Sequence, residues 1–276
     1  MAEVWDDRPC ELGEGPLWHP ERGELFWFDI LGRKLMSKAR VWEFDHNVSA
    51  AGWIDRDTLL VAGDGALSTF DIATGAREEV VALEADDPAT RSNDGRADPQ
   101  GGFWIGTMGR TAEPGLGSIY RYYRGELRKL FDRITISNSI CFAPEGDRAF
   151  FADTAAETIW QVPLDRHGWP VEGRQVFVEG AEGCDGAVCD AEGHVWSARW
   201  GPGQVVRLTP DGRVDHVETL PVPQVSCPAL TPDGTLYATT AREGMGRDAL
   251  AAAPMSGAVF KVLEGLAGRA EQRVIL

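Results

Sequence analysis

The 276-residue chain has 43 acidic and 27 basic side chains, which give a formal net charge of −16 and a sequence pI near 4.7. This excess of carboxylates argues against nucleic acid and anionic membrane surfaces as partners, because both are bound through Lys and Arg. A hydrophobic fraction of 43% with ten Trp predicts a packed globular protein, and no apolar run is long enough to cross a bilayer.

The first seven residues have neither the basic stretch nor the apolar stretch of a secretory signal peptide. The five Cys are odd in number, form no C-x-x-C pair and have no suitably spaced His. They therefore predict reduced, packed thiols rather than disulfides or a zinc site. Together these features predict a cytoplasmic protein.

One pattern, a turn rich in Pro, Gly and Asp followed by a short strand with bulky side chains, recurs six times. The copies lie at residues 19–29, 54–63 (a degenerate copy), 98–107, 143–153, 190–199 and 231–240. Equivalent strand positions are Trp27, Leu60, Trp104, Phe151, Trp196 and Tyr237, at intervals of 33 to 47 residues. Such intervals match the length of a four-stranded propeller blade.

Further hairpins, such as residues 118–131, lie between the copies, and only residues 248–253 look locally helical. The sequence therefore predicts an all-β fold, a six-bladed β-propeller with one domain over residues 1–276. We expect the terminal segments 3–5 and 273–276 to close its sheet edges.

Polar residues stand 11 to 13 positions ahead of the strand marker in four of the six repeats: Glu14, Asn93, Asn138 and Asp185. The first strand of each propeller blade lines the central channel, so residues at one offset face one another around the axis. Arg91 accompanies Asn93. The second and sixth repeats offer only Ser49 and Ser226 or Cys227 there, so the polar set is predicted to be lopsided.

Two carboxylates in a narrow channel repel each other unless a cation lies between them. The all-oxygen set suits Ca²⁺, Mg²⁺ or Mn²⁺, and three protein ligands leave positions open for water and a substrate oxygen. The alternative interpretation is structural. Asx-Gly before a strand is ordinary turn chemistry, Asp94 is expected to cap such a turn, and an axial ion can be purely structural.

Four motifs, taken in order, resemble the gluconolactonase/regucalcin (senescence marker protein) family: GEGPLW at 13–18, RSNDG at 91–95, SN at 137–138 and DG at 185–186. The likeness covers about residues 10–262. It implies a six-bladed propeller that hydrolyses sugar lactones with one divalent metal. The resemblance further implies metal ligands at Glu14, Asn138 and Asp185, with Asp185 also as general base, and substrate binding by Arg91, Asn93 and Glu113.

The last blade, with Arg199-Trp200-Gly201, is similar to the bacterial sugar-lactonase branch of that family. Two residues depart from the family pattern. Ser139 stands where a Gly usually follows the channel Asn, and Cys184 stands where a Pro often precedes the channel Asp. Both lie beside implied ligands, so they bear on pocket shape and metal preference.

The resulting hypothesis is metal-dependent hydrolysis of an aldonolactone, such as glucono- or pentonolactone, to the open-chain acid. Ca²⁺ is the first choice of cofactor, with Zn, Mg, Mn and Fe also compatible with oxygen ligands. Two alternatives stay open: a lactonase or esterase acting on a non-sugar ester, and a non-catalytic propeller that binds calcium or a protein partner. We expect a small-molecule sugar lactone as partner, no nucleic acid, no membrane, and a monomer or weak dimer.

Overall fold

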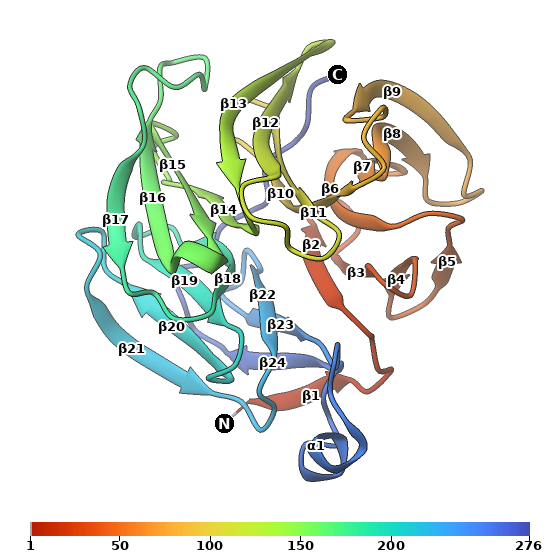
Figure 1. Cartoon of the computed structure of the whole chain (residues 1–276), viewed down its shortest axis with the longest axis vertical. Coiled ribbons are helices and arrows are strands. Elements are labelled where there is room, and N and C mark those ends of the chain that lie inside the picture. Colours follow the sequence, from red (N-terminus) through yellow and green to blue (C-terminus); the bar gives the residue numbers. More distant parts are fainter. Residues whose placement is uncertain (1) are drawn as a thin grey trace.

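The computed structural model describes residues 2–276, which form six four-stranded antiparallel sheets arranged around a central axis (Figure 1). The prediction of an all-β six-bladed propeller is confirmed. Within these residues the one α-helix is α1, Arg247–Ala252, which overlaps the stretch 248–253 that was predicted to be helical. No helix there is long and apolar enough to span a membrane.

The blades follow the chain, and the strand named first in each lies nearest the axis. Blade 1 has β2 (Gly13–His19), β3 (Glu24–Asp29), β4 (Lys34–Ser37) and β5 (Val41–Glu43), and blade 2 has β6 (Val48–Asp55), β7 (Thr58–Gly63), β8 (Gly65–Asp71) and β9 (Arg77–Leu83). Blade 3 has β10 (Thr90–Ala97), β11 (Phe103–Gly109), β12 (Gly117–Tyr123) and β13 (Glu126–Ile134). Blade 4 has β14 (Ser137–Phe142), β15 (Arg148–Asp153), β16 (Thr158–Pro163) and β17 (Gln175–Glu179), with the 3-10 turn η1 (Thr154–Ala156). Blade 5 has β18 (Cys184–Cys189), β19 (Val195–Arg199), β20 (Gln204–Leu208) and β21 (Val214–Thr219), and blade 6 has β22 (Val225–Leu230), β23 (Leu236–Thr240), β24 (Val259–Leu263) and β1 (Glu3–Asp6).

The recurring turn joins the first strand of each blade to the second. In blade 3 the Asp98 carboxylate accepts the backbone N–H groups of Gln100 and Gly102, and Gly101 takes a left-handed φ of 90°. The bulky residue that follows, Trp104, is fully buried between the sheets. The repeat is therefore a local unit of turn chemistry plus one inter-blade anchor. All five Cys are free and buried, as predicted.

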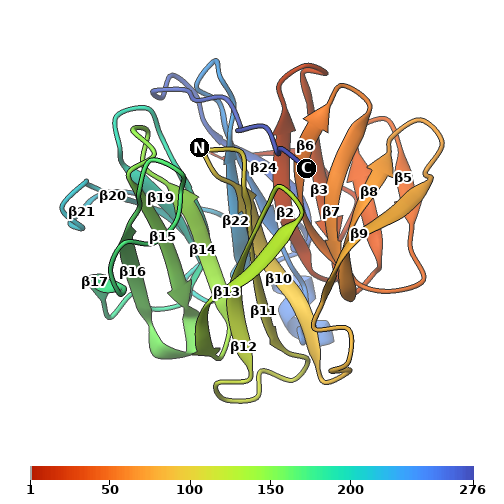
Figure 2. The ribbon, with the colours of Figure 1, turned by 90° about the horizontal axis from the view of Figure 1, so that it is seen from above.

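The two termini close the ring differently. Strand β1 pairs with β24, so the N-terminal segment completes blade 6 as predicted. The prediction for 273–276 holds at one point only: Arg273 forms a single parallel bridge with Trp53 on the edge strand β6, and these residues add no strand to a blade. Instead residues 266–276, here called the C-terminal strap, cross one end of the channel (Figure 2). The strap bonds to the backbone of five blades: Leu266 to Gly234, Ala267 to Ala191, Arg269 to Phe142 and Ala143, Val274 to Trp53, and Ile275 to Gly101.

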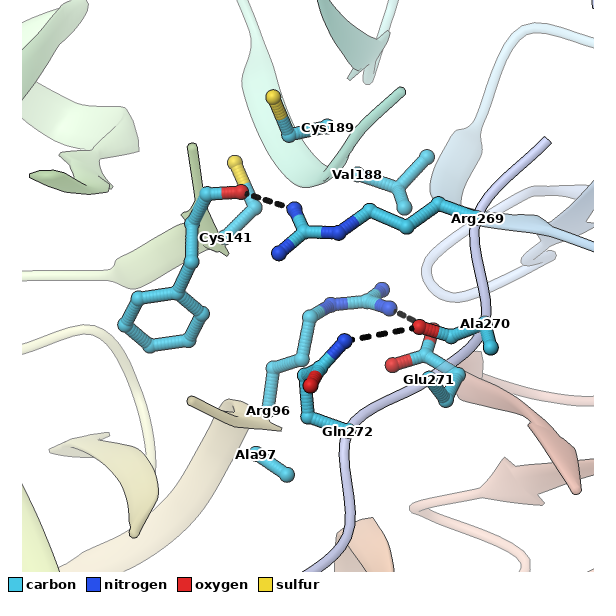
Figure 3. A pocket seen from close by; sticks show the side chains of 10 residues that line it. Arg96, Ala97, Cys141, Val188, Cys189, Arg269, Ala270, Glu271 and Gln272 are labelled. Carbon is cyan, nitrogen blue, oxygen red and sulfur yellow. Dashed lines mark hydrogen bonds and ion pairs between the residues drawn. The ribbon is translucent and has the colours of Figure 1, made fainter. Parts of the chain in front are cut away.

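Beneath the strap, Arg96 on β10 forms a buried ion pair with Glu271, and a cavity of about 30 Å³ lies between them and Arg269 (Figure 3). Buried charges are tolerated when they are paired. The strap therefore covers this end of the channel with matched charges and with the buried side chain of Val274.

The innermost strand of every blade has a β-bulge near its beginning, at the end of the channel away from the strap. The register shifts lie at Glu14/Leu17, Val48/Ala50, Ser92/Gly95, Asn138/Cys141, Cys184/Ala187 and Val225/Pro228. A bulge breaks the pleat alternation and re-aims side chains. Six bulges at one level thus turn the residues there toward the axis.

Candidate active site in the channel mouth

A pocket of about 350 Å³ opens at the end of the channel opposite the strap. Its floor comes from the bulged inner strands. Its walls come from the loop after β11, the η1 turn, Trp200 and the loop that carries Glu243. Five of the six predicted site residues line it together: Glu14, Arg91, Asn93, Asn138 and Asp185. All five are more than nine-tenths buried.

Two carboxylates meet in this pocket. The side chains of Glu14, on β2, and Asp185, on β18, are hydrogen-bonded to each other. Burial, followed by the charge of Asp94, raises the pKa of Glu14 to about 8, and burial together with the Glu14 charge raises the pKa of Asp185 well above its usual range. Two buried carboxyl groups in contact thus favour a shared proton over two negative charges.

A chain of hydrogen bonds fixes the neighbouring polar groups across blades 3 to 5. Arg91 Nη1 donates to Asn93 Oδ1 (2.7 Å), and Asn93 Nδ2 donates to Asn138 Oδ1 (3.0 Å). Asn138 Nδ2 donates to Thr154 Oγ1 (2.8 Å), whose hydroxyl donates to the Cys184 carbonyl (2.6 Å). The amide oxygen of Asn138 therefore accepts a bond from Asn93, and its amide nitrogen is held by Thr154. The Nε and Nη2 groups of Arg91 have no partner among residues 2–276 and remain for a ligand.

A third buried carboxylate, Asp94, lies beside this network. Its Oδ2 accepts the backbone N–H of Ile140 on β14 at 2.7 Å, and burial raises its pKa to about 6. The expectation that Asp94 caps its own turn is wrong, because the carboxylate bonds to the next blade. In the sequence, the only indication that Asp94 lies beside the site was its position directly after the channel residue Asn93.

Glu113 lies elsewhere. It stands in the loop between β11 and β12, outside the pocket lining, and its carboxylate accepts the N–H (3.1 Å) and hydroxyl (2.6 Å) of Thr111. Arg110 and Thr111 of the same loop do line the pocket. Substrate binding by Glu113 stays a prediction.

Sequence reasoning missed several wall residues, among them Thr154, Arg110 and Glu243. These residues lie on connecting loops, whose positions over the channel no repeat pattern encodes. Trp200 also lines the pocket, whereas Trp18 stacks on Tyr237.

The oxygen donors at the pocket floor decide whether a metal ion fits there. Within residues 2–276 no three His, Cys, Asp or Glu side chains gather closely enough to hold one. A cation here would instead use two carboxylates and an amide oxygen, from Glu14, Asp185 and Asn138. Paired buried carboxylates and an amide oxygen at the floor of an open pocket suit a hard divalent cation, so the residues fit.

A family model described as "SMP-30/Gluconolactonase/LRE-like region" matches residues 12–242. L-arabinolactonase from Azospirillum brasilense is 35% identical, with 99% of this chain and 95% of that one covered. The 6-deoxy-6-sulfogluconolactonase from Pseudomonas putida is 30% identical, with coverages of 96% and 95%. Among solved structures, a calcium-binding protein, regucalcin, from Agrobacterium tumefaciens strain C58 superposes with a TM-score of 0.97 at 43% identity, with coverages of 100% and 98%.

Proposed function

The chain belongs to the SMP-30/gluconolactonase/LRE-like family, and from this premise we propose that it is a lactonase that hydrolyses a sugar-derived lactone, such as a glucono- or pentonolactone, to the open-chain acid. The observation that carries the proposal is the convergence of Glu14, Asn138 and Asp185 with Arg91 and Asn93 in one pocket. Sugar-lactone hydrolysis by relatives at 30–35% identity over nearly the whole chain supports the same reaction class.

Glu14, Asn138 and Asp185 would hold one divalent cation, for which Ca²⁺ is the first choice and Zn²⁺, Mg²⁺, Mn²⁺ and Fe²⁺ are compatible. The ion would take the place of the proton that Glu14 and Asp185 otherwise hold between them. A bound divalent cation supplies Lewis-acid polarisation of the ester carbonyl and lowers the pKa of water at the site.

The side chains carry the proton transfers. Asp185 accepts a proton from the water molecule that attacks the lactone carbonyl carbon. The tetrahedral intermediate then collapses with cleavage of the bond to the ring oxygen. Asp185 returns the proton to that oxygen, which becomes the hydroxyl of the product.

Arg91 and Asn93 orient the substrate. The free N–H groups of Arg91 donate charge-assisted hydrogen bonds to the carbonyl or to ring hydroxyls, which strengthen as negative charge develops. Asn93 is held by its bonds to Arg91 and Asn138, so it couples the hydroxyl-binding side of the pocket to the ligand side. A pocket this polar favours hydroxylated substrates over aryl or phosphotriester substrates.

The calcium-binding neighbour at 43% identity favours a second candidate, a propeller that binds calcium without catalysis. One experiment separates the two. Lactone hydrolysis is followed by pH indicator with gluconolactone and pentonolactones, first on chelator-treated protein and then with each divalent ion restored. Turnover that disappears with the chelator and returns with one ion supports the lactonase. Ion binding measured by calorimetry without turnover on any of the lactones supports the second candidate.

A further inference from the structure

We propose that Ser139 is a positioning residue that ties the Asp185 bulge of blade 5 to the Asn138 bulge of blade 4, and so sets the spacing of two ligands of the proposed metal site. The inference rests on the proposed function through that metal site. It concerns a position where the sequence departs from the family pattern.

The backbone of Ser139 has the conformation that normally selects glycine. Its φ is 55°, in the left-handed region, and the residue is 0% exposed. In blade 1 the corresponding residue, directly after Glu14, is Gly15 with a φ of 50°. A serine in this conformation is unfavourable by backbone criteria. Some interaction of its side chain must offset that cost.

That interaction is a hydrogen bond to the neighbouring blade. Ser139 Oγ donates to the backbone carbonyl of Asp185 at 2.5 Å. The bulge in β18 shifts the register between Cys184 and Ala187, so Asp185 has no partner residue on β19. The hydroxyl of Ser139 therefore holds the Asp185 carbonyl from the neighbouring blade, at the point where β18 is out of register with β19.

The corresponding junction between blades 1 and 2 has no room for such a side chain. A Cβ added at Gly15 would lie 2.2 Å from the carbonyl oxygen of Ser49, so the two backbones meet directly there. Between blades 4 and 5 the Ser139 side chain fills the space and turns the contact into a hydrogen bond. At this junction the serine thus replaces a direct backbone contact with a hydrogen bond from its side chain to the Asp185 carbonyl, here called the tether.

The tether joins two residues of the proposed metal site. Asn138 is the chain neighbour of the donor, and the acceptor carbonyl belongs to Asp185 itself. Loss of the hydroxyl would free the Asp185 bulge to shift relative to Asn138. Groups that hold metal ligands in place typically change metal affinity by roughly ten- to a hundredfold when they are removed.

The experiment compares Ser139→Ala, which keeps the Cβ in the left-handed backbone, with Ser139→Gly, which relieves the backbone. The dissociation constant of Ca²⁺ is measured by calorimetry, and the unfolding midpoint is measured on chelator-treated protein. We expect both variants to weaken Ca²⁺ binding by about tenfold or more, because both lack the hydroxyl. Their metal-free midpoints should differ, with Gly the more stable, because only Ala retains the strained φ.

Ser49→Ala is the matched control. Ser49 is also buried, and its Oγ donates to Ser92 Oγ of the next blade at 2.8 Å. This bond involves no proposed metal ligand, and the backbone contact of Ser49 with Gly15 is kept in the variant. It should lower stability without changing Ca²⁺ affinity.

Unchanged affinity in both Ser139 variants, or wild-type affinity in Ser139→Gly alone, would overturn the tether. Lactone turnover of the wild type is measured in parallel. If the wild type binds Ca²⁺ but hydrolyses no lactone, the proposed function is wrong, whereas the role proposed for the Ser139–Asp185 hydrogen bond is unaffected. A wild-type protein that binds none of the divalent ions overturns both.

Discussion

Glu14 on β2 and Asp185 on β18 lie in hydrogen-bond contact across the channel, although blade 6 separates their blades in the ring. Two buried carboxyl groups so close are costly to the fold unless a proton or a cation lies between them. The pair therefore lowers the stability of the fold, as the proposed cation site would require of its empty form.

Glu14→Gln should separate stability from binding. The amide removes one buried carboxyl group, so the metal-free protein should gain about 1 kcal/mol, seen as a higher unfolding midpoint after chelation. Added Ca²⁺ should stabilise the variant far less than the wild type, because stabilisation follows ligand affinity. A lower metal-free midpoint, or an undiminished response to Ca²⁺, would contradict the pairing.

Arg91→Ala should lower kcat/KM for gluconolactone by about a hundredfold, because the free guanidinium N–H groups are assigned to the substrate. Arg110→Ala is the control. It also removes an Arg from the pocket wall, but Arg110 is partly exposed and paired with Asp64 at 3.0 Å, so its loss should cost less than about threefold. Full turnover in Arg91→Ala would remove Arg91 from the substrate site.

Glu243 should select against anionic substrates. It lines the pocket and is exposed, and its carboxylate has no hydrogen-bond or ion-pair partner among residues 2–276, although its backbone carbonyl accepts from Gln224 Nε2. Glu243→Gln should raise kcat/KM for a lactone with a sulfonate or carboxylate by roughly fivefold at low salt, while the neutral gluconolactone changes little. The difference should shrink in 0.5 M salt. Equal effects on charged and neutral lactones would show that Glu243 does not select substrates by their charge.

Arg199→Met should stabilise the protein. Arg199 is 5% exposed and its Nη1 is buried without a partner, whereas the corresponding positions on β3 and β15 are Asp29 and Asp153, which accept loop N–H groups. Removing a buried cation without a partner should raise the free energy of unfolding by about 1 kcal/mol.

Arg121→Met makes the opposite comparison. Arg121 and Asp98 are both 0% exposed and form an ion pair of 2.6 Å. Loss of that guanidinium leaves Asp98 unpaired and should lower the free energy of unfolding by about 3 kcal/mol or more. Thermal denaturation measures both variants, and a lower midpoint for Arg199→Met would show that its guanidinium has an unrecognised partner.

The fold and the site floor were predictable because both repeat. Trp27 and its counterparts recur at blade spacing, and Asn93 and Asp185 stand at one offset ahead of them because every inner strand is bulged at the same level. A local pattern repeated six times encodes its own symmetry. The sequence therefore revealed which residues share the axis without revealing the bulges that turn them inward.

Contacts outside the repeat were not predictable. The strap residues bond to turns that lie far away in the chain, such as Val274 to Trp53, so no periodicity signals their course. Glu243 and Thr154 reach the pocket on loops of irregular length. Ser139 was recognised as a departure, but its partner could be identified only once blades 4 and 5 were seen in contact.

Because the C-terminal strap covers one end of the channel, the pocket opens to solvent only at the other end. If this pocket is the lactonase site, as proposed, the lactone would enter and the acid formed from it would leave through the same mouth, one after the other. Substrate and product differ in charge, because the lactone is neutral and the product acid is an anion at neutral pH. A chain with a net charge of −16 and with Glu243 at the pocket mouth repels the anionic product but not the neutral lactone. Hydrolysis would thus turn a neutral substrate, which the negative potential of the protein does not repel, into an anionic product that it does repel, and this repulsion would favour product release.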